Sequence, residues 1–132
     1  ELLFWDAPSG KQLPRGGSAL RNEDWATWTC ALGWPVQGVF KPNWNGSDVN
    51  AVARSVQQLA GDCRVLAAAD DFGQIRLYKY PCLSKASQGV VLSGHSSHVT
   101  NVCFSANDDY LLSTGGEDQT VMQWRLGGPE GL

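Results

Sequence analysis

The region near the carboxyl end of the chain holds the residue types of a hydrolytic triad. His95, Thr114 and Asp118 supply an imidazole, a hydroxyl and a carboxylate within one short stretch. In such triads the imidazole takes the proton of the hydroxyl while the carboxylate orients the imidazole. Asp118, however, falls in a turn between two strand patterns, and no activated nucleophile is indicated beside it. We therefore expect a structural network, in which His95 donates to Asp118 and Thr114 bridges His95 to the indole N–H of Trp124, because a buried polar chain is stable only when every member is paired.

Signals for other chemistries are missing. His95 and His98 could begin a metal site, but no third ligand is evident, so we expect no metal. The cysteines are too widely spaced for a zinc knuckle or a redox motif and are expected to be small buried hydrophobes; they are Cys30, Cys63, Cys82 and Cys103. The sequence has neither a Gly-rich phosphate loop nor a nucleophile elbow. We therefore predict a protein that is not an enzyme and uses no cofactor.

Composition and charge limit the partners. Of the 132 residues, 42% are hydrophobic and 17% are charged, which is a globular composition. The net charge of −3 argues against nucleic acid and membrane surfaces as partners. No apolar stretch approaches the ~20 residues needed to span a bilayer. The chain opens at Glu1 inside a strand pattern and without a signal peptide, so we expect it to be a piece of a longer protein.

Alternating apolar and polar residues predict three strands in the last third of the chain, at residues 99–104, 110–114 and 120–124. Turn-forming residues separate them, at 105–109 and 115–119. This pattern indicates an antiparallel meander of short strands that would position the triad-like residues.

A Trp-rich stretch precedes these strands. Residues 25–30 alternate and predict an outer strand, and residues 36–40 predict another strand that turns into a strand over residues 48–53. Residues 55–60 are the one place where a turn of helix is expected. We expect most of the tryptophans in this stretch to fill the core, with one or two exposed binding anchors as the alternative; they are Trp25, Trp28, Trp34 and Trp44.

The chain also repeats itself. Residues 48–55 align with residues 98–105 at an offset of 50, and residues 71–78 align with residues 117–124 at an offset of 46. A β-propeller blade takes about 40–45 residues when it carries no insertion. We therefore predict an all-β chain of propeller blades.

The second repeat closely resembles the WD-repeat signature. The matching positions are Gly94-His95, Phe104-Ser105, Ser113-Thr114-Gly115, the turn residue Asp118 and the closing Trp124. The first repeat departs from this signature, because Trp44-Asn45 stands where Gly-His is expected and Tyr78 stands where Trp is expected. Its polar chain is therefore expected to be missing or rewired.

The insertion between Leu13 and Asp48 narrows the choice of family among WD-repeat proteins, because ordinary WD repeats lack such a Trp-rich stretch. Its tryptophans, followed by Tyr80-Pro81-Cys82 and by residues 94–102, resemble the C-terminal WD repeats of the echinoderm microtubule-associated protein-like (EMAP-like) family. The resemblance covers about residues 2–126.

The resemblance implies a tandem atypical β-propeller and association with tubulin and microtubules. It also implies a location in the cytoplasm and cytoskeleton, with the spindle as a candidate site. The expected function is a non-catalytic protein-interaction scaffold. The alternative is a generic WD-repeat adaptor that binds peptides, such as a signalling or ubiquitin-ligase platform.

In these terms residues 1–13 are the end of a preceding WD blade and residues 14–82 are an atypical blade with the insertion. Residues 83–126 are a regular blade, and residues 127–132 are a flexible tail. The chain is then about two four-stranded antiparallel blades plus the end of a preceding one. Because so few blades cannot close a ring, we expect the isolated chain to self-associate or to require the remaining blades.

WD propellers place certain residues at one rim of the central channel, namely those that begin the first strand and those that precede the turn Asp. The resemblance thus implies a candidate protein-binding rim. It consists of Asp48, Asn50, Asp70, Asp71, His98, Thr100 and Glu117.

Overall fold

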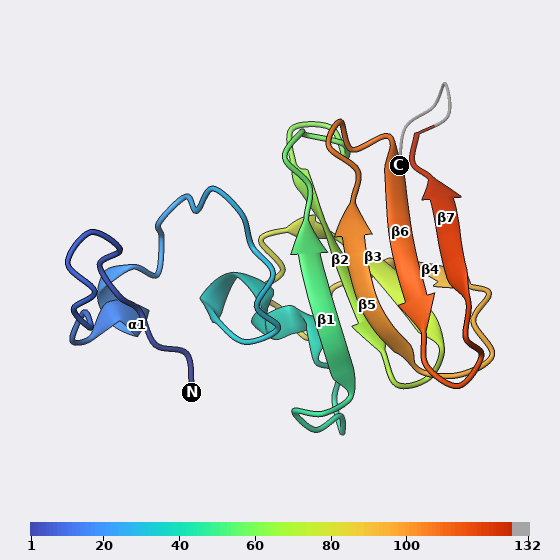
Figure 1. The fold of residues 1–132 in the computed structure, drawn as a ribbon, viewed down its shortest axis with the longest axis horizontal. Coiled ribbons are helices and arrows are strands. Elements are labelled where there is room, and N and C mark those ends of the chain that lie inside the picture. Colours follow the sequence, from blue (N-terminus) through green and yellow to red (C-terminus); the bar gives the residue numbers. More distant parts are fainter. Residues whose placement is uncertain (128–132) are drawn as a thin grey trace.

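The computed structural model describes residues 1–127, which contain two antiparallel β-sheets packed against each other (Figure 1). The first sheet has the strand order β1-β2-β3-β4, and the second, within the described residues, has the order β5-β6-β7. The strands are β1 (Val49–Arg54), β2 (Arg64–Asp70), β3 (Gln74–Tyr80), β4 (Val90–Ser93), β5 (Val99–Phe104), β6 (Tyr110–Gly115) and β7 (Val121–Arg125). The helices are α1 (Gly16–Ala19) and the 3₁₀ helix η1 (Trp34–Val39). The predicted all-β class with propeller blades is confirmed.

Both sheets are built on the same plan, as the internal repeat requires. In each sheet the first two strands shift register near the start of the first strand. The shift lies between Val49 and Ala51 in β1 and between Val99 and Asn101 in β5. A β-bulge of this kind re-aims the side chains that follow it. Its recurrence at an offset of 50 residues supports the alignment of the two repeats.

Strand β4 belongs to the first sheet. It pairs with β3, from Gln74 opposite Ser93 to Leu77 opposite Val90. The residues after Cys82 therefore complete the first sheet, although the sequence repeat assigns them to the second unit. Within residues 1–127 the second sheet has three strands where four were expected, which leaves the outer edge of β7 without a partner strand there.

The two sheets pack face to face through an apolar core, in which β1 lies beside β5 (Figure 1). Its central members are Ala67, Ala69, Ile75, Leu77, Val99, Val102 and Leu111, all buried. Burying one aliphatic side chain of the larger kind contributes about 1.5–3 kcal/mol. This interface is therefore the main source of cohesion between the sheets.

Hydrogen bonds cross between the sheets at both ends of this core. At one end the Asn50 side chain donates to the carbonyl oxygen of Val99 over 3.0 Å. At the other end the Asp108 carboxylate accepts the backbone N–H groups of Val56 and Gln57, each over 2.7 Å. The two sheets are therefore fastened at two separated points.

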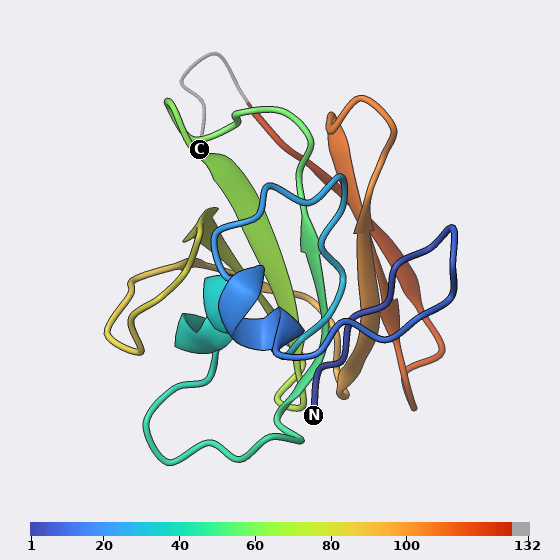
Figure 2. The ribbon, with the colours of Figure 1, turned by 90° about the vertical axis from the view of Figure 1, so that its left-hand side faces the viewer.

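The Trp-rich insertion covers the other face of the first sheet, as the side view shows (Figure 2). Trp28, Val36 and Val39 are buried against this face. Arg54 of β1 donates to the carbonyl oxygens of residues 25 and 26, over 2.6 and 3.0 Å, and so fixes the insertion to the strand. The insertion therefore gives this face of the sheet an apolar cover.

The secondary structure predicted before β2 is wrong in three places. Residues 25–30 form no strand, and residues 36–40 fall largely in η1 instead of a strand. Pro35 explains the second error, since it lies at the start of η1, where its fixed φ suits a helix and its missing N–H is not needed. Residues 55–60 form no helix, whereas α1, which had no periodic signal, does.

The four tryptophans differ in exposure, between the predicted core positions and the alternative of exposed anchors. Trp28 is buried, at 7% exposure, whereas Trp34 is 39% exposed, and Trp25 and Trp44 are half-buried. The cysteines are all free, but of the four only Cys82 is buried, and Cys103 is exposed. The prediction that all four cysteines are buried is therefore wrong, because residue 103 follows the β5 bulge and points away from the core between the sheets.

Residues 4–13 form a small hairpin bridged between Trp5 and Gln12. Phe4 of this hairpin stacks on Trp25, with ring centroids 5.5 Å apart. Among residues 1–127 no helix is long and apolar enough to cross a membrane. The predicted tail, residues 127–132, lies outside the described residues except for Gly127.

Candidate functional site

A buried polar network joins the loop before β5 to the two strands that follow it. His95 Nδ1 lies 2.8 Å from Asp118 Oδ2, and His95 Nε2 lies 2.8 Å from Ser113 Oγ. The indole N–H of Trp124 donates to the same Ser113 oxygen over 2.8 Å. These bonds are all satisfied when His95 carries its proton on Nδ1 and Ser113 donates to Nε2. Both imidazole nitrogens, the Ser113 hydroxyl and the indole N–H of this network then have partners.

The bridging hydroxyl is that of Ser113, so the prediction that Thr114 makes the bridge is wrong. Side chains alternate along β6, and Ser113 points to the same side as its cross-strand partner Met122. Trp124 follows on that side two residues later. Thr114 points the other way, and its hydroxyl bonds to Thr100 over 2.7 Å. Trp124 pairs with Leu111, so alternate residues of β6, including Ser113, lie on the Trp124 side. This pairing was the signal that could have identified Ser113.

The Ser113–His95–Asp118 geometry has the bonds of a hydrolytic triad but not the access. Ser113 is 1% exposed and the His95 side chain is 0% exposed, so no substrate reaches the hydroxyl. Burial raises the pKa of Asp118, but the bonds from His95 and from the N–H groups of residues 120 and 96 outweigh it and hold the pKa below its usual range. Asp118 thus remains a charged hydrogen-bond acceptor for His95.

The first sheet replaces this network with an aromatic contact. By strand register, Ala68 stands at the position of Ser113 and Tyr78 at that of Trp124. By sequence alignment, Phe72 stands where Asp118 does. The ring of Phe72 lies against that of Trp44, with centroids 5.2 Å apart. The polar chain of the first repeat was expected to be missing or rewired, and at these positions the structure has an aromatic contact in its place.

The candidate rim residues all lie at one end of the strands, where β1 and β5 begin and where the β2–β3 and β6–β7 turns lie (Figure 1). Asp71 and Asn50 are exposed and bonded to each other, over 2.7 Å. Asp48 is half-buried and accepts the N–H of Asn45 over 2.7 Å. These three residues form a polar strip on the rim of the first sheet.

Asp70 does not belong to that strip. It is 1% exposed, and its carboxylate accepts the N–H groups of Phe72 and Gln74, both over 2.9 Å. Its second oxygen pairs with the Arg76 guanidinium over 3.2 Å. Including Asp70 among surface residues was therefore wrong, since it closes the β2–β3 turn.

The second sheet contributes the remaining rim residues. Thr100 and Glu117 are exposed, and His98 is half-buried. The His98 imidazole lies so close to Gly116 that a side chain there would collide with it. Among residues 1–127 no three His, Cys, Asp or Glu side chains come together to hold a metal ion. The second part of the rim is thus polar, solvent-facing and without a metal cluster.

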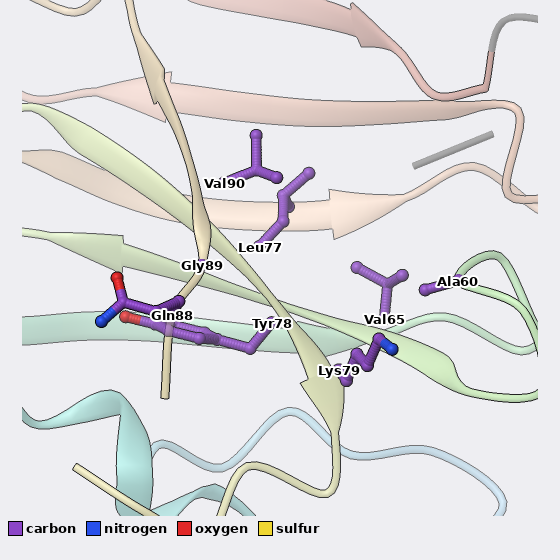
Figure 3. A pocket seen from close by; sticks show the side chains of 8 residues that line it. All are labelled: Ala60, Val65, Leu77, Tyr78, Lys79, Gln88, Gly89 and Val90. Carbon is purple, nitrogen blue, oxygen red and sulfur yellow. The ribbon is translucent and has the colours of Figure 1, made fainter. Parts of the chain in front are cut away.

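A separate hollow of about 300 Å³ lies beside β3, next to the start of β4 (Figure 3). Apolar side chains form most of its wall, among them Val65, Leu77 and Val90. Lys79 and Gln88 are polar members, but no acid–base pair lines it. Val65 and Leu77 also belong to the apolar core between the sheets, so the hollow lies at the edge of that core.

Comparison with known proteins decides the family. The sequence model of the second β-propeller of echinoderm microtubule-associated proteins matches residues 1–126. The chain belongs to this family. The resemblance to EMAP-like proteins inferred from the Trp-rich insertion is thereby confirmed.

Several EMAP-like proteins are similar along almost the whole chain. Echinoderm microtubule-associated protein-like 4 of Xenopus laevis is 46% identical over 96% of this chain and 13% of its own length. Human echinoderm microtubule-associated protein-like 2 is 46% identical over 96% of this chain and 18% of its own length. Mouse echinoderm microtubule-associated protein-like 3 is 42% identical over 96% of this chain and 14% of its own length. The chain therefore spans less than a fifth of the length of these curated relatives.

Proposed function

We propose that this chain is part of a non-catalytic scaffold that associates with microtubules or tubulin in the cytoplasmic cytoskeleton. Membership of the EMAP-like β-propeller family carries this proposal, since its relatives are named as microtubule-associated proteins. The buried position of the triad-like residues is consistent with a scaffold, because they stabilise the blade and do not face a substrate.

We further propose that the rim at the loop end of the strands is the surface that contacts the partner. The side chains concerned are Asp48, Asn50, Asp71, His98, Thr100 and Glu117. Most of them are exposed, and none belongs to the apolar core between the sheets. Loops and strand ends positioned by a rigid sheet are where binding residues concentrate.

Co-sedimentation of the full-length protein with microtubules and pull-down with soluble tubulin test this function. Reversing the charge at Asp48 and Glu117 together, with Lys at both, should change the affinity by about tenfold, because rim charges set association with a charged partner, and an acidic partner should bind this variant more tightly. Asp62→Lys is the matched control, since Asp62 is also exposed but lies in the β1–β2 loop at the opposite end. An absence of tubulin binding by the unaltered protein contradicts the function. Equal binding by the rim variant and the control contradicts the choice of surface.

A further inference from the structure

The rim of the first sheet exposes an aromatic ring that the core does not need. Phe72, at the tip of the β2–β3 turn, is 60% exposed. Its ring contacts Trp44 at an interplanar angle of 40°. The aligned position of the second sheet holds Asp118, which is buried in the polar network. The first repeat has thus exchanged an inward-facing polar residue for an outward-facing aromatic one.

The aromatic pair Trp44–Phe72 is held in place by charged and backbone groups. The N–H of Phe72 donates to the Asp70 carboxylate over 2.9 Å. The same carboxylate binds Arg76, whose guanidinium lies over the Trp44 ring, 5.3 Å from its centroid. Such a cation–π contact helps to hold the ring in place. A surface that is already ordered loses little conformational entropy when a partner binds.

A hollow of about 310 Å³ opens beside Trp44. Leu32, Phe40 and Trp44 form its apolar wall, and Gln37 and Lys85 are polar members. This volume is at the lower end of the range for ligand sites. It therefore suits one or two apolar side chains of a partner segment.

The charge that the hollow offers to a partner is positive. The nearby carboxylates of Asp48, Asp70 and Asp71 are not among the residues that line the hollow, and Asp70 is neutralised by its pair with Arg76. Lys85 lines the hollow, is exposed, and forms no ion pair with any side chain of residues 1–127. An anionic group placed next to an apolar side chain would thus complement the site.

We propose that the aromatic pair and the adjoining hollow are a docking site for an extended acidic polypeptide segment. An apolar side chain of the segment enters the hollow beside Trp44 and packs toward Phe72, while a neighbouring carboxylate pairs with the Lys85 ammonium. This site deepens the proposed function, on which it rests for the identity of the partner protein, because it names the chemistry recognised on that partner.

Fluorescence anisotropy with the full-length protein tests the site, using as probe a short labelled peptide of glutamates around one phenylalanine. We expect saturable binding that falls at least fivefold with Phe72→Ala and with Lys85→Glu. Replacing the central phenylalanine by alanine should weaken binding similarly, and a lysine-based peptide should not bind. Val56→Ala and Lys79→Glu are matched controls, because both residues are exposed but lie outside the site. Thermal melts establish that each variant is folded.

Two results would overturn this site: no preference for the acidic peptide over the basic one, or equal affinity of the Phe72 and Lys85 variants and their controls. Tubulin pull-down with the same proteins separates this failure from that of the proposed function. Tubulin binding without peptide binding rejects the docking site alone. Peptide binding that depends on Phe72 and Lys85, in a protein that ignores tubulin, supports the site and rejects tubulin as the partner.

Discussion

Replacing Ser113 with alanine removes the hydroxyl that links His95 to Trp124. Ser113 is 1% exposed, and its oxygen lies 2.8 Å from both partner nitrogens. Without it the indole N–H and the imidazole Nε2 lose their partners where water has little access. Each unsatisfied buried group costs about 1–3 kcal/mol, and Trp124 is only half-buried, so we expect a loss of about 2–4 kcal/mol. This loss is a large part of the free energy of unfolding of a typical protein, which is about 5–15 kcal/mol.

Thr114→Ala is the matched control for Ser113→Ala. The Thr114 hydroxyl bonds to Thr100 on the solvent-facing side, so its loss should cost less than about 1 kcal/mol. Urea unfolding followed by tryptophan fluorescence gives both free energies, provided that the slope with urea is unchanged. A Ser113→Ala variant within about 0.5 kcal/mol of the unaltered protein would refute the network, since deleting a buried hydrogen bond rarely costs so little. So would a Thr114→Ala variant that is equally unstable.

Four further measurements test the packing. The Tyr78 hydroxyl is buried without a partner in residues 1–127, so Tyr78→Phe should stabilise by about 1 kcal/mol. Burial also raises the pKa of Tyr78 to about 12 from 10.0, so the folded form keeps its proton longer. The unaltered protein should therefore lose stability between pH 10 and 12 relative to this variant, and parallel urea curves there would disprove the effect. Gly38→Ala places a Cβ 2.5 Å from a backbone oxygen and should cost about 1–3 kcal/mol in urea unfolding, whereas Gly46→Ala, with nothing within 4 Å, should be near neutral. Asp108→Ala should cost about 2–4 kcal/mol by the same assay, because two backbone N–H groups lose their acceptor; a cost no larger than that of Gly46→Ala contradicts a stabilising role for these bonds between the sheets. The 132-residue chain alone should sediment as more than a monomer, because within residues 1–127 no strand pairs with the outer edge of β7 and no sheet covers the outer face of the second sheet; a stable monomer contradicts this.

The second sheet was predictable because its strands are short runs that alternate in large part and are bounded by turns containing glycine and aspartate. Residues 99–104 and 110–114 become β5 and β6 almost as predicted. The face of the sheet toward which each side chain points was harder to predict. A bulge between Val99 and Asn101 shifts the pairing, and only the register with β7 shows that Ser113 shares a side with Trp124. Propensity alone does not carry this information, because it depends on a partner strand.

The insertion was not predictable from periodicity. Trp28, Val36 and Val39 are buried by contact with the first sheet, not by a repeating pattern of their own. A short helix such as η1 lacks enough turns to show a period, and Pro35 was the local sign of it. The role of Phe72 could have been suspected from the alignment, since an aromatic residue there replaces the turn carboxylate of the other repeat.

The two fastenings between the sheets have a mechanical consequence. The Asn50 amide and the Asp108 carboxylate hold opposite ends of the neighbouring strands β1 and β5. A pull that tried to open the sheets like a hinge at either end would load the bond at the other end as well as the apolar contact between them. We therefore expect the pair to resist bending and to part in one step under tension. We expect such a pair of sheets to behave as a stiff unit that transmits force between its attached partners with little deformation.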